Sequence, residues 1–130
     1  MFKIALASHG SLCRGMRETA KLFTRDVSFI QIFPFYEENP ESDVEVQLDA
    51  WIQDIHEEDV VVMLTDILWG SVNQKNVHIV TGLNLPLLLE MITMEPQSVI
   101  PELISEKVKS CRDSIAFMRE VTVEFQDGDE

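Results

Sequence analysis

The segment Ile4-Ala5-Leu6-Ala7-Ser8-His9-Gly10-Ser11 decides the fold that we expect for this chain. It begins as a short apolar run, typical of a buried strand, and leads directly into a histidine. From Ser11 onward, apolar side chains recur at helical spacing. A histidine between a strand end and a helix start lies where anions bind, because the first backbone N–H groups of a helix have no partner within it. We therefore expect His9 to be the centre of the functional site.

The apolar pattern divides the 130 residues into alternating strands and helices. The expected strands are residues 2–8, 27–33, 60–64, 77–80 and 121–125. The expected helices are residues 11–23, 44–55 and 87–94, a short one within 67–76, and a long last helix with apolar positions from Ile104 to Met118. This length is typical of one domain. We assign residues 1–126 to it and expect 127–130 to be a disordered tail.

Proline and capping residues give the expected ends of several elements. Pro34 either ends the second strand or marks it as an edge strand, since proline cannot donate a ladder hydrogen bond. Ser42 or Asn39 could cap the helix that follows. Pro86 can start the short apolar helix.

The alternation of strands and helices predicts an α/β fold, with a mostly parallel sheet and helices on both faces. Residues 60–64 are all apolar, which indicates a central strand covered on both faces. In the last expected strand only alternate residues are apolar. We expect that strand to be an antiparallel edge or to be lent to a partner subunit.

His9 and Asp66 each follow an expected strand, the first and the third. In a sheet of order 2-1-3-4 these strands are neighbours, and ligands bind between their carboxyl ends. An aspartate that accepts a hydrogen bond from one imidazole nitrogen fixes the tautomer and leaves the other nitrogen as a nucleophile. Each residue alone has a simpler interpretation, His9 as a turn histidine and Asp66 as a cap. Their placement at adjacent strand ends favours a catalytic pair.

Four further residues are candidates for holding a phosphoryl group. Gly10 and Ser11 offer donors at the start of the first helix, and Gly70 and Ser71 follow Asp66 closely. Ser71 is equally well explained as a helix cap.

Other residues that could carry chemistry have simpler explanations. His56 is expected at the surface and His78 within a strand, and neither is expected to act. Trp69 could line the site or simply pack. Cys13 and Cys111 fall on apolar helix faces, so we expect buried free thiols rather than a disulfide.

The charge and composition exclude several classes of partner. Twenty-three acidic against ten basic residues give a formal net charge of −13. Nucleic acids and anionic membranes both require basic patches, so neither is expected, whereas a protein with a basic face would suit this chain. We see no signal-peptide pattern and no apolar run long enough for membrane insertion, and therefore expect a cytoplasmic protein. Nucleotide-binding glycine motifs, a serine nucleophile motif and zinc-ligand spacing are absent, so no cofactor or metal is expected.

Three segments together resemble the IIA component of the mannose-class sugar phosphotransferase system. They are the strand ending in Ser8-His9-Gly10, the stretch from Val60 to Ser71 around Asp66, and residues 81–90, which are similar to the family's Gly-x-Asn-x-Pro-x-Leu segment. The resemblance extends over nearly the whole chain in order and spacing. It departs from the family between Asp66 and Gln74, where Trp69, Val72 and Gln74 replace a glycine, a proline and an asparagine.

The resemblance implies a parallel 2-1-3-4 sheet and a fifth, antiparallel strand exchanged across a homodimer. It also implies that His9 accepts a phosphoryl group from the phosphorylated carrier HPr and passes it to a IIB component. From there the group would reach a sugar entering through the IIC/IID permease. Two alternatives stay open on the same fold: a regulatory or signalling module, and the phosphotransferase subunit of a dihydroxyacetone kinase.

Overall fold

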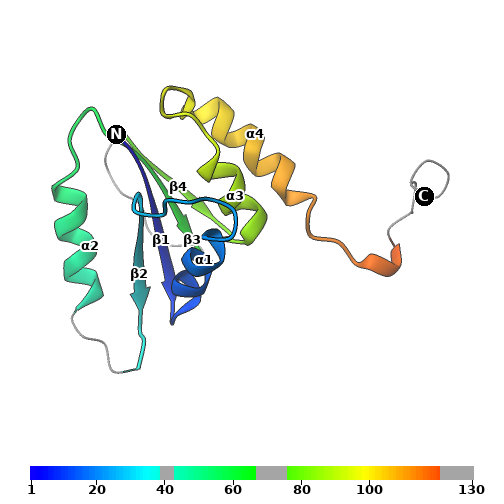
Figure 1. The fold of residues 1–130 in the computed structure, drawn as a ribbon, viewed down its shortest axis with the longest axis horizontal. Helices are drawn as coiled ribbons and strands as arrows, with labels where there is room; N and C mark the ends of the chain where they lie inside the picture. The colour runs from blue at the N-terminus through cyan, green and yellow to red at the C-terminus, as the bar shows by residue number, and fades with distance from the viewer. Residues whose placement is uncertain (39–42, 67–75, 121–130) are drawn as a thin grey trace.

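A four-stranded parallel sheet of order β2-β1-β3-β4 forms the centre of the molecule, as Figure 1 shows for the computed structural model. The model describes residues 1–38, 43–66 and 76–120. The strands are β1 (Phe2–His9), β2 (Ile30–Phe35), β3 (Val60–Thr65) and β4 (Val77–Thr81). The predicted α/β class, the parallel pairing and the strand order are confirmed.

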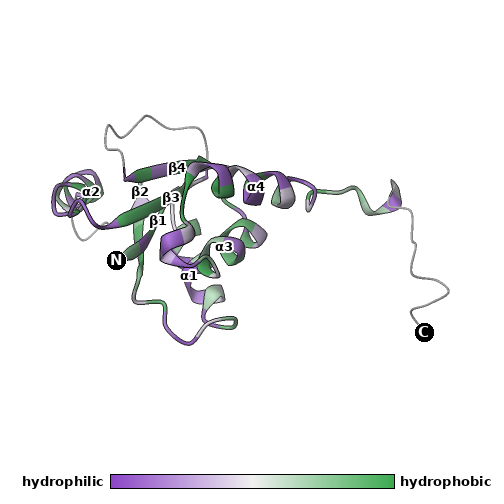
Figure 2. Cartoon of the chain, turned by 90° about the horizontal axis from the view of Figure 1, so that it is seen from above, coloured by the Kyte–Doolittle hydropathy of each residue, from purple (hydrophilic) through white to green (hydrophobic). Residues whose placement is uncertain are grey.

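Helices cover both faces of this sheet (Figure 2). They are α1 (Leu12–Ala20), α2 (Val44–Gln53), α3 (Leu85–Ile92) and α4 (Pro101–Arg112), with short 3-10 turns η1 (Pro96–Ser98) and η2 (Met118–Glu120). Helices α1, α3 and α4 contribute to one hydrophobic cluster, and α2 contributes to the other.

Alternate side chains of β1 belong to these two clusters. Ile4 and Leu6 point into the cluster shared with α1, α3 and α4, whereas Ala5 and Ala7 point toward α2. All four are fully buried. Burial of a large apolar side chain contributes about 1.5–3 kcal/mol, so β1 is held firmly and the position of His9 at its end is fixed.

Helix caps account for the two helix starts near the site. Asp43, and neither Ser42 nor Asn39, caps α2: its carboxylate accepts from the N–H groups of Glu45 and Val46. That part of the prediction was wrong because an aspartate directly before the apolar pattern satisfies the free N–H groups itself. Helix α3 begins at Leu85, two residues earlier than expected, because the Asn84 side chain caps it.

Three predicted boundaries were wrong. The second strand covers Ile30–Phe35 instead of 27–33. Pro34 therefore lies inside the strand and does not end it. β2 is an edge strand, which confirms the other expectation for Pro34. The first helix ends at Ala20, so Phe23 is 61% exposed. The last helix ends at Arg112, with Asp113 as its C-cap, and does not continue to Met118.

The expectation for the two cysteines is confirmed, whereas three predicted segments fall outside the described residues. Cys13 and Cys111 are free and buried, and burial raises the pKa of both thiols. The expected strand 121–125, the tail 127–130 and nearly all of the segment 67–76 lie outside the described residues. Among the helices that the structure describes, none has the length and apolar character needed to cross a bilayer.

Candidate functional site

His9 and Asp66 meet at the carboxyl ends of the two central strands. Ala7 pairs with Thr65 across β1 and β3, which brings the next residues of both strands to the same edge. The backbone N–H of His9 donates to Oδ2 of Asp66 at 2.8 Å, and the imidazole Nδ1 lies 3.2 Å from Oδ1. The predicted contact between the two residues is therefore confirmed.

This geometry distinguishes the two imidazole nitrogens of His9. An ionised carboxylate only accepts hydrogen bonds, which assigns the proton to Nδ1 of His9. The lone pair of Nε2 then points away from Asp66. The His9 side chain is 49% exposed against 15% for Asp66, so the imidazole is accessible while the carboxylate is largely covered.

The backbone after His9 turns sharply into α1. Gly10 adopts a φ of 63°, which favours glycine, and its N–H donates to the carbonyl of Phe35 at 2.6 Å. Ser11 is the N-cap residue of α1, but its side chain makes no capping hydrogen bond. The structure thus places Gly10 and Ser11 beside His9, as the sequence predicted.

The buried side chain of Ser8 stabilises the first turn of α1, a role that the sequence did not predict. It is 1% exposed, and its Oγ accepts the N–H of Cys13 at 2.9 Å. One of the helix's first N–H groups is thereby satisfied by a buried hydroxyl. A serine three residues before the expected helix start was the available signal.

Tyr36 was also missed, and its ring lies next to the His9 ring. The ring centroids are 5.5 Å apart at an interplanar angle of 31°. Tyr36 has a φ of 62°, a left-handed conformation that costs a non-glycine residue about 1–2 kcal/mol. Its side chain is 82% exposed.

An ion pair fixes the residue that follows Tyr36. Nε and a terminal nitrogen of Arg14 contact the two carboxylate oxygens of Glu37 at 2.8 and 3.0 Å. These hydrogen bonds hold the pKa of Glu37 below its usual value. Helix α1 is thereby tied to the segment after β2.

An open hollow of about 450 Å³ lies beside His9. Its lining residues are Gly10, Ser11, Tyr36, Glu37 and Glu38. Two of the five are acidic, so the hollow favours cationic groups of a partner over free anions.

Of the other residues that the sequence singled out, three lie outside the described residues and two lie elsewhere in the fold. Gly70, Ser71 and Trp69 lie outside the described residues. His56 precedes β3 and therefore lies at the opposite end of the sheet from His9, and His78 lies within β4. Within residues 1–38, 43–66 and 76–120, no group of three or more histidine, cysteine or acidic side chains could hold a metal ion.

A family model described as the PTS system fructose IIA component, EIIA-man, matches residues 3–108. The chain belongs to this family. It is a IIA phosphocarrier component of a sugar phosphotransferase system, and hence a phosphotransferase. The resemblance that the sequence suggested is confirmed.

Solved structures share the fold of this IIA component. One is described as a phosphoenolpyruvate-dependent sugar phosphotransferase system permease from Klebsiella pneumoniae, with a TM-score of 0.79, 24% identity and 92% of each chain covered. Another is a mannose/sorbose-specific IIA subunit from Enterococcus faecalis, with a TM-score of 0.73, 15% identity, and 93% of this chain and 97% of the other covered. A sigma-54 interaction domain protein from Enterococcus faecalis has a TM-score of 0.65, 18% identity, and 93% and 97% coverage.

Proposed function

We propose that Nε2 of His9 accepts a phosphoryl group from the phosphohistidine of HPr and passes it to a IIB component. Transfer from IIB to a sugar entering through the IIC/IID permease would complete the sequence, on the cytoplasmic side of the membrane. The observation that carries this proposal is the contact between His9 Nδ1 and Asp66, which leaves Nε2 unprotonated and accessible.

The transfer step needs no proton movement and no cofactor. The Nε2 lone pair attacks phosphorus, and the new P–N bond forms as the donor's P–N bond breaks. The electron pair of the broken bond stays on the donor nitrogen. His9 keeps its Nδ1 proton, so its ring becomes positively charged beside the Asp66 carboxylate. A hydrogen bond to such a charged group contributes about 1.5–3 kcal/mol.

Backbone and hydroxyl groups around His9 are proposed to receive the phosphoryl oxygens. Ser11 lies at the start of α1, where N–H groups and the helix dipole favour negative charge, and Gly10 directly precedes it with its own N–H donated to the carbonyl of Phe35. Gly70 and Ser71 are proposed to complete the set from the other side. The acidic hollow with Glu37 and Glu38 suits a basic face on HPr or IIB.

The test is phosphoryl uptake in a reconstituted system. Labelled phosphoenolpyruvate, enzyme I and HPr should transfer acid-labile phosphate to the wild-type protein but not to His9→Ala. His78→Ala, which removes a histidine in β4, is the matched control and should be labelled normally. If the wild-type protein stays unlabelled, or if His9→Ala is labelled equally, the proposal fails.

A regulatory role is the second candidate, favoured by the similar fold of the sigma-54 interaction domain protein. A regulatory module would take up phosphate on His9 and deliver none to a IIB domain. Adding purified IIB proteins to the labelled protein therefore separates the two roles. Loss of label from His9 to a IIB protein supports the carrier.

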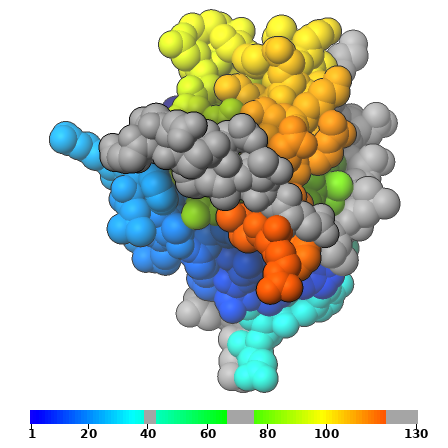
Figure 3. Space-filling view, turned by 90° about the vertical axis from the view of Figure 1, so that its right-hand side faces the viewer, coloured from blue at the N-terminus to red at the C-terminus, as the bar shows by residue number. Residues whose placement is uncertain are grey.

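We also propose that residues 1–126 form one domain that works as a homodimer, through an exchanged strand at 121–125. Residues 113–120, which follow α4, extend away from the sheet (Figure 1), and Figure 3 views the molecule from that side. Ile115, Phe117 and Met118 on this segment are 79%, 64% and 73% exposed. Three exposed large apolar residues in a short segment are typical of a surface that a second chain covers.

A further inference from the structure

Tyr36 is the residue beside His9 that the proposed phosphoryl transfer does not yet use. We infer that it is a positioning residue, whose ring stacks on the imidazole and stabilises the positive charge that His9 gains when phosphorylated. The inference rests on the proposed function of His9. It assigns a task to an aromatic side chain that directly follows β2 and belongs to neither strand of the His9–Asp66 pair.

The contact geometry supports a direct interaction between the two rings. Their centroids lie 5.5 Å apart and their planes are inclined by 31°. Aromatic pairs prefer centroid distances of about 4.5–7 Å in offset or tilted arrangements. Asp66 contacts the imidazole at Nδ1 and Tyr36 lies next to the same ring, while the His9 side chain stays 49% exposed.

The backbone holds Tyr36 next to His9 in a left-handed conformation that tyrosine rarely adopts. Its φ of 62° is strained for a tyrosine, and the residues on both sides of it are fixed. Before it, the carbonyl of Phe35 accepts the N–H of Gly10 at 2.6 Å. After it, Glu37 is held by both nitrogen contacts of Arg14. The first contact ties Tyr36 to the turn after His9, and the second ties it to α1.

Packing does not account for this strain. Tyr36 is 82% exposed, so its ring contributes little buried area to the fold. Strained residues held by their surroundings cluster at functional sites. The electrons of an aromatic face attract a cation, and the effect at an exposed site corresponds to about a two- to fivefold change in an equilibrium or rate.

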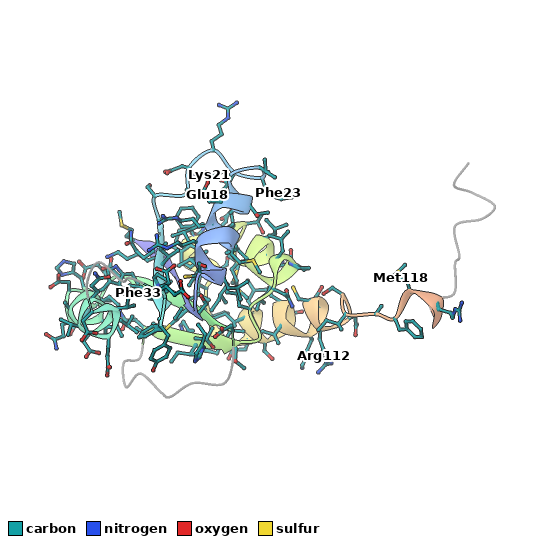
Figure 4. The ribbon with its side chains drawn as sticks, turned by 90° about the horizontal axis from the view of Figure 1, so that it is seen from below. Glu18, Lys21, Phe23, Phe33, Arg112 and Met118 are labelled. Atoms are coloured by element: carbon teal, nitrogen blue, oxygen red, sulfur yellow. The ribbon has the colours of Figure 1, made fainter. Side chains whose placement is uncertain are left out.

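Three variants test the inference. Tyr36→Leu removes the aromatic face but keeps an apolar side chain, and Tyr36→Phe keeps the face without the hydroxyl. Phe23→Leu is the matched control, because Phe23 is another exposed aromatic residue beyond the far end of α1, labelled in Figure 4. Thermal unfolding of each variant verifies that the fold is retained.

The rate of phosphorylation of His9 is measured with two donors. One is phosphorylated HPr, and the other is potassium phosphoramidate, which phosphorylates accessible histidines without a protein partner. His9→Ala supplies the background from His56 and His78. Attack by Nε2 builds positive charge on the ring with either donor, so Tyr36→Leu should react about two- to fivefold more slowly with both. Tyr36→Phe should recover most of that loss, and Phe23→Leu should react like the wild type.

The outcomes separate this inference from the proposed function. If Tyr36→Leu reacts with phosphoramidate as fast as the wild type or faster, the inference is overturned, whatever HPr does. Equal slowing in Tyr36→Leu and Tyr36→Phe would overturn it too, since the hydroxyl would then be the active group. If HPr fails to label the wild type while phosphoramidate shows the Tyr36 effect, the proposed function fails and the inference stands.

Discussion

Asp66 holds His9 by two hydrogen bonds at once, one to its backbone and one to its ring. Oδ2 accepts the backbone N–H at 2.8 Å and Oδ1 lies 3.2 Å from Nδ1, although the two residues are 57 positions apart. One carboxylate therefore joins the ends of β1 and β3 and also orients the imidazole. One carboxylate oxygen thus contacts the backbone of His9 and the other contacts its ring.

Replacing Asp66 with asparagine should separate these two tasks. The amide oxygen of Asp66→Asn can still accept the His9 backbone N–H, so the fold should be retained. The NH₂ group then faces Nδ1 and donates to it, which moves the ring proton to Nε2. We expect phosphoryl uptake to slow by about 10- to 100-fold, the loss expected for a hydrogen bond to a charged group.

Labelled uptake measures that rate, and ¹⁵N spectra of the His9 ring report the tautomer. An unchanged rate in a variant with the proton on Nε2 would contradict the role that we give to Asp66.

Ser8 and Ser11 are expected to behave differently although they lie three residues apart. Ser8→Ala leaves the buried N–H of Cys13 without its acceptor and should lower the free energy of unfolding by about 1–3 kcal/mol. Ser11→Ala is the matched variant, and because Ser11 makes no capping bond its stability should change by about 0.5 kcal/mol or less. Urea unfolding of the two proteins gives the comparison. Equal stability of the two variants would show that Ser8 does not secure α1.

Asp59 should make the fold sensitive to acid. Its carboxylate accepts the N–H of His56 and lies 3.3 Å from both Lys3 Nζ and the terminal amine, and these contacts lower its pKa from 3.8 to about 2. A lowered pKa means that the folded state favours the charged form. The stabilisation is therefore complete above about pH 4 and is lost as the pH falls toward 2.

The melting temperature as a function of pH tests this directly. Asp59→Asn should lower it at neutral pH and flatten its decline between about pH 4 and 2. Asp49→Asn, an exposed aspartate of α2, is the control and should keep the wild-type profile. If Asp59→Asn has the same dependence of melting temperature on pH as the wild type, Asp59 is not the source of the acid sensitivity.

Removing the residues from Val121 onward should weaken dimerisation. The truncated chain loses the strand proposed for exchange but keeps the exposed residues Ile115, Phe117 and Met118. Sedimentation equilibrium of the full and shortened chains at several concentrations gives the dissociation constants, which should differ by at least tenfold. Equal constants would exclude strand exchange through this segment.

The sequence predicted those parts of the fold in which apolar spacing and burial coincide. The run Val60–Leu64 corresponds to β3, and the expected meeting of His9 and Asp66 followed from topology alone. The predicted boundaries were wrong where apolar residues lie outside the strand or helix to which the prediction assigned them. Val27 and Phe29 pack on the core from the turn before β2, which moved the predicted strand three residues too early.

That displacement also hid Tyr36. A strand ending at residue 33 leaves Tyr36 in a connection, whereas the observed end at Phe35, in register with His9, places it at the edge where the site forms. The left-handed φ of Tyr36 has no signal in the sequence, because tyrosine rarely adopts it. The early end of α4 was missed for a related reason, since Ile115 and Met118 continue the apolar spacing but are exposed.

Pro34 determines how this sheet can grow. The carbonyl of Phe35 points toward β1, where it accepts from Gly10, so the backbone of its neighbour Pro34 points to the open side of β2. Proline has no N–H to offer there, and a strand added on that side would lose a ladder bond. Among the four described strands, β4 forms the other edge of the sheet, so a strand exchanged from a second copy, as we propose, is expected to join there.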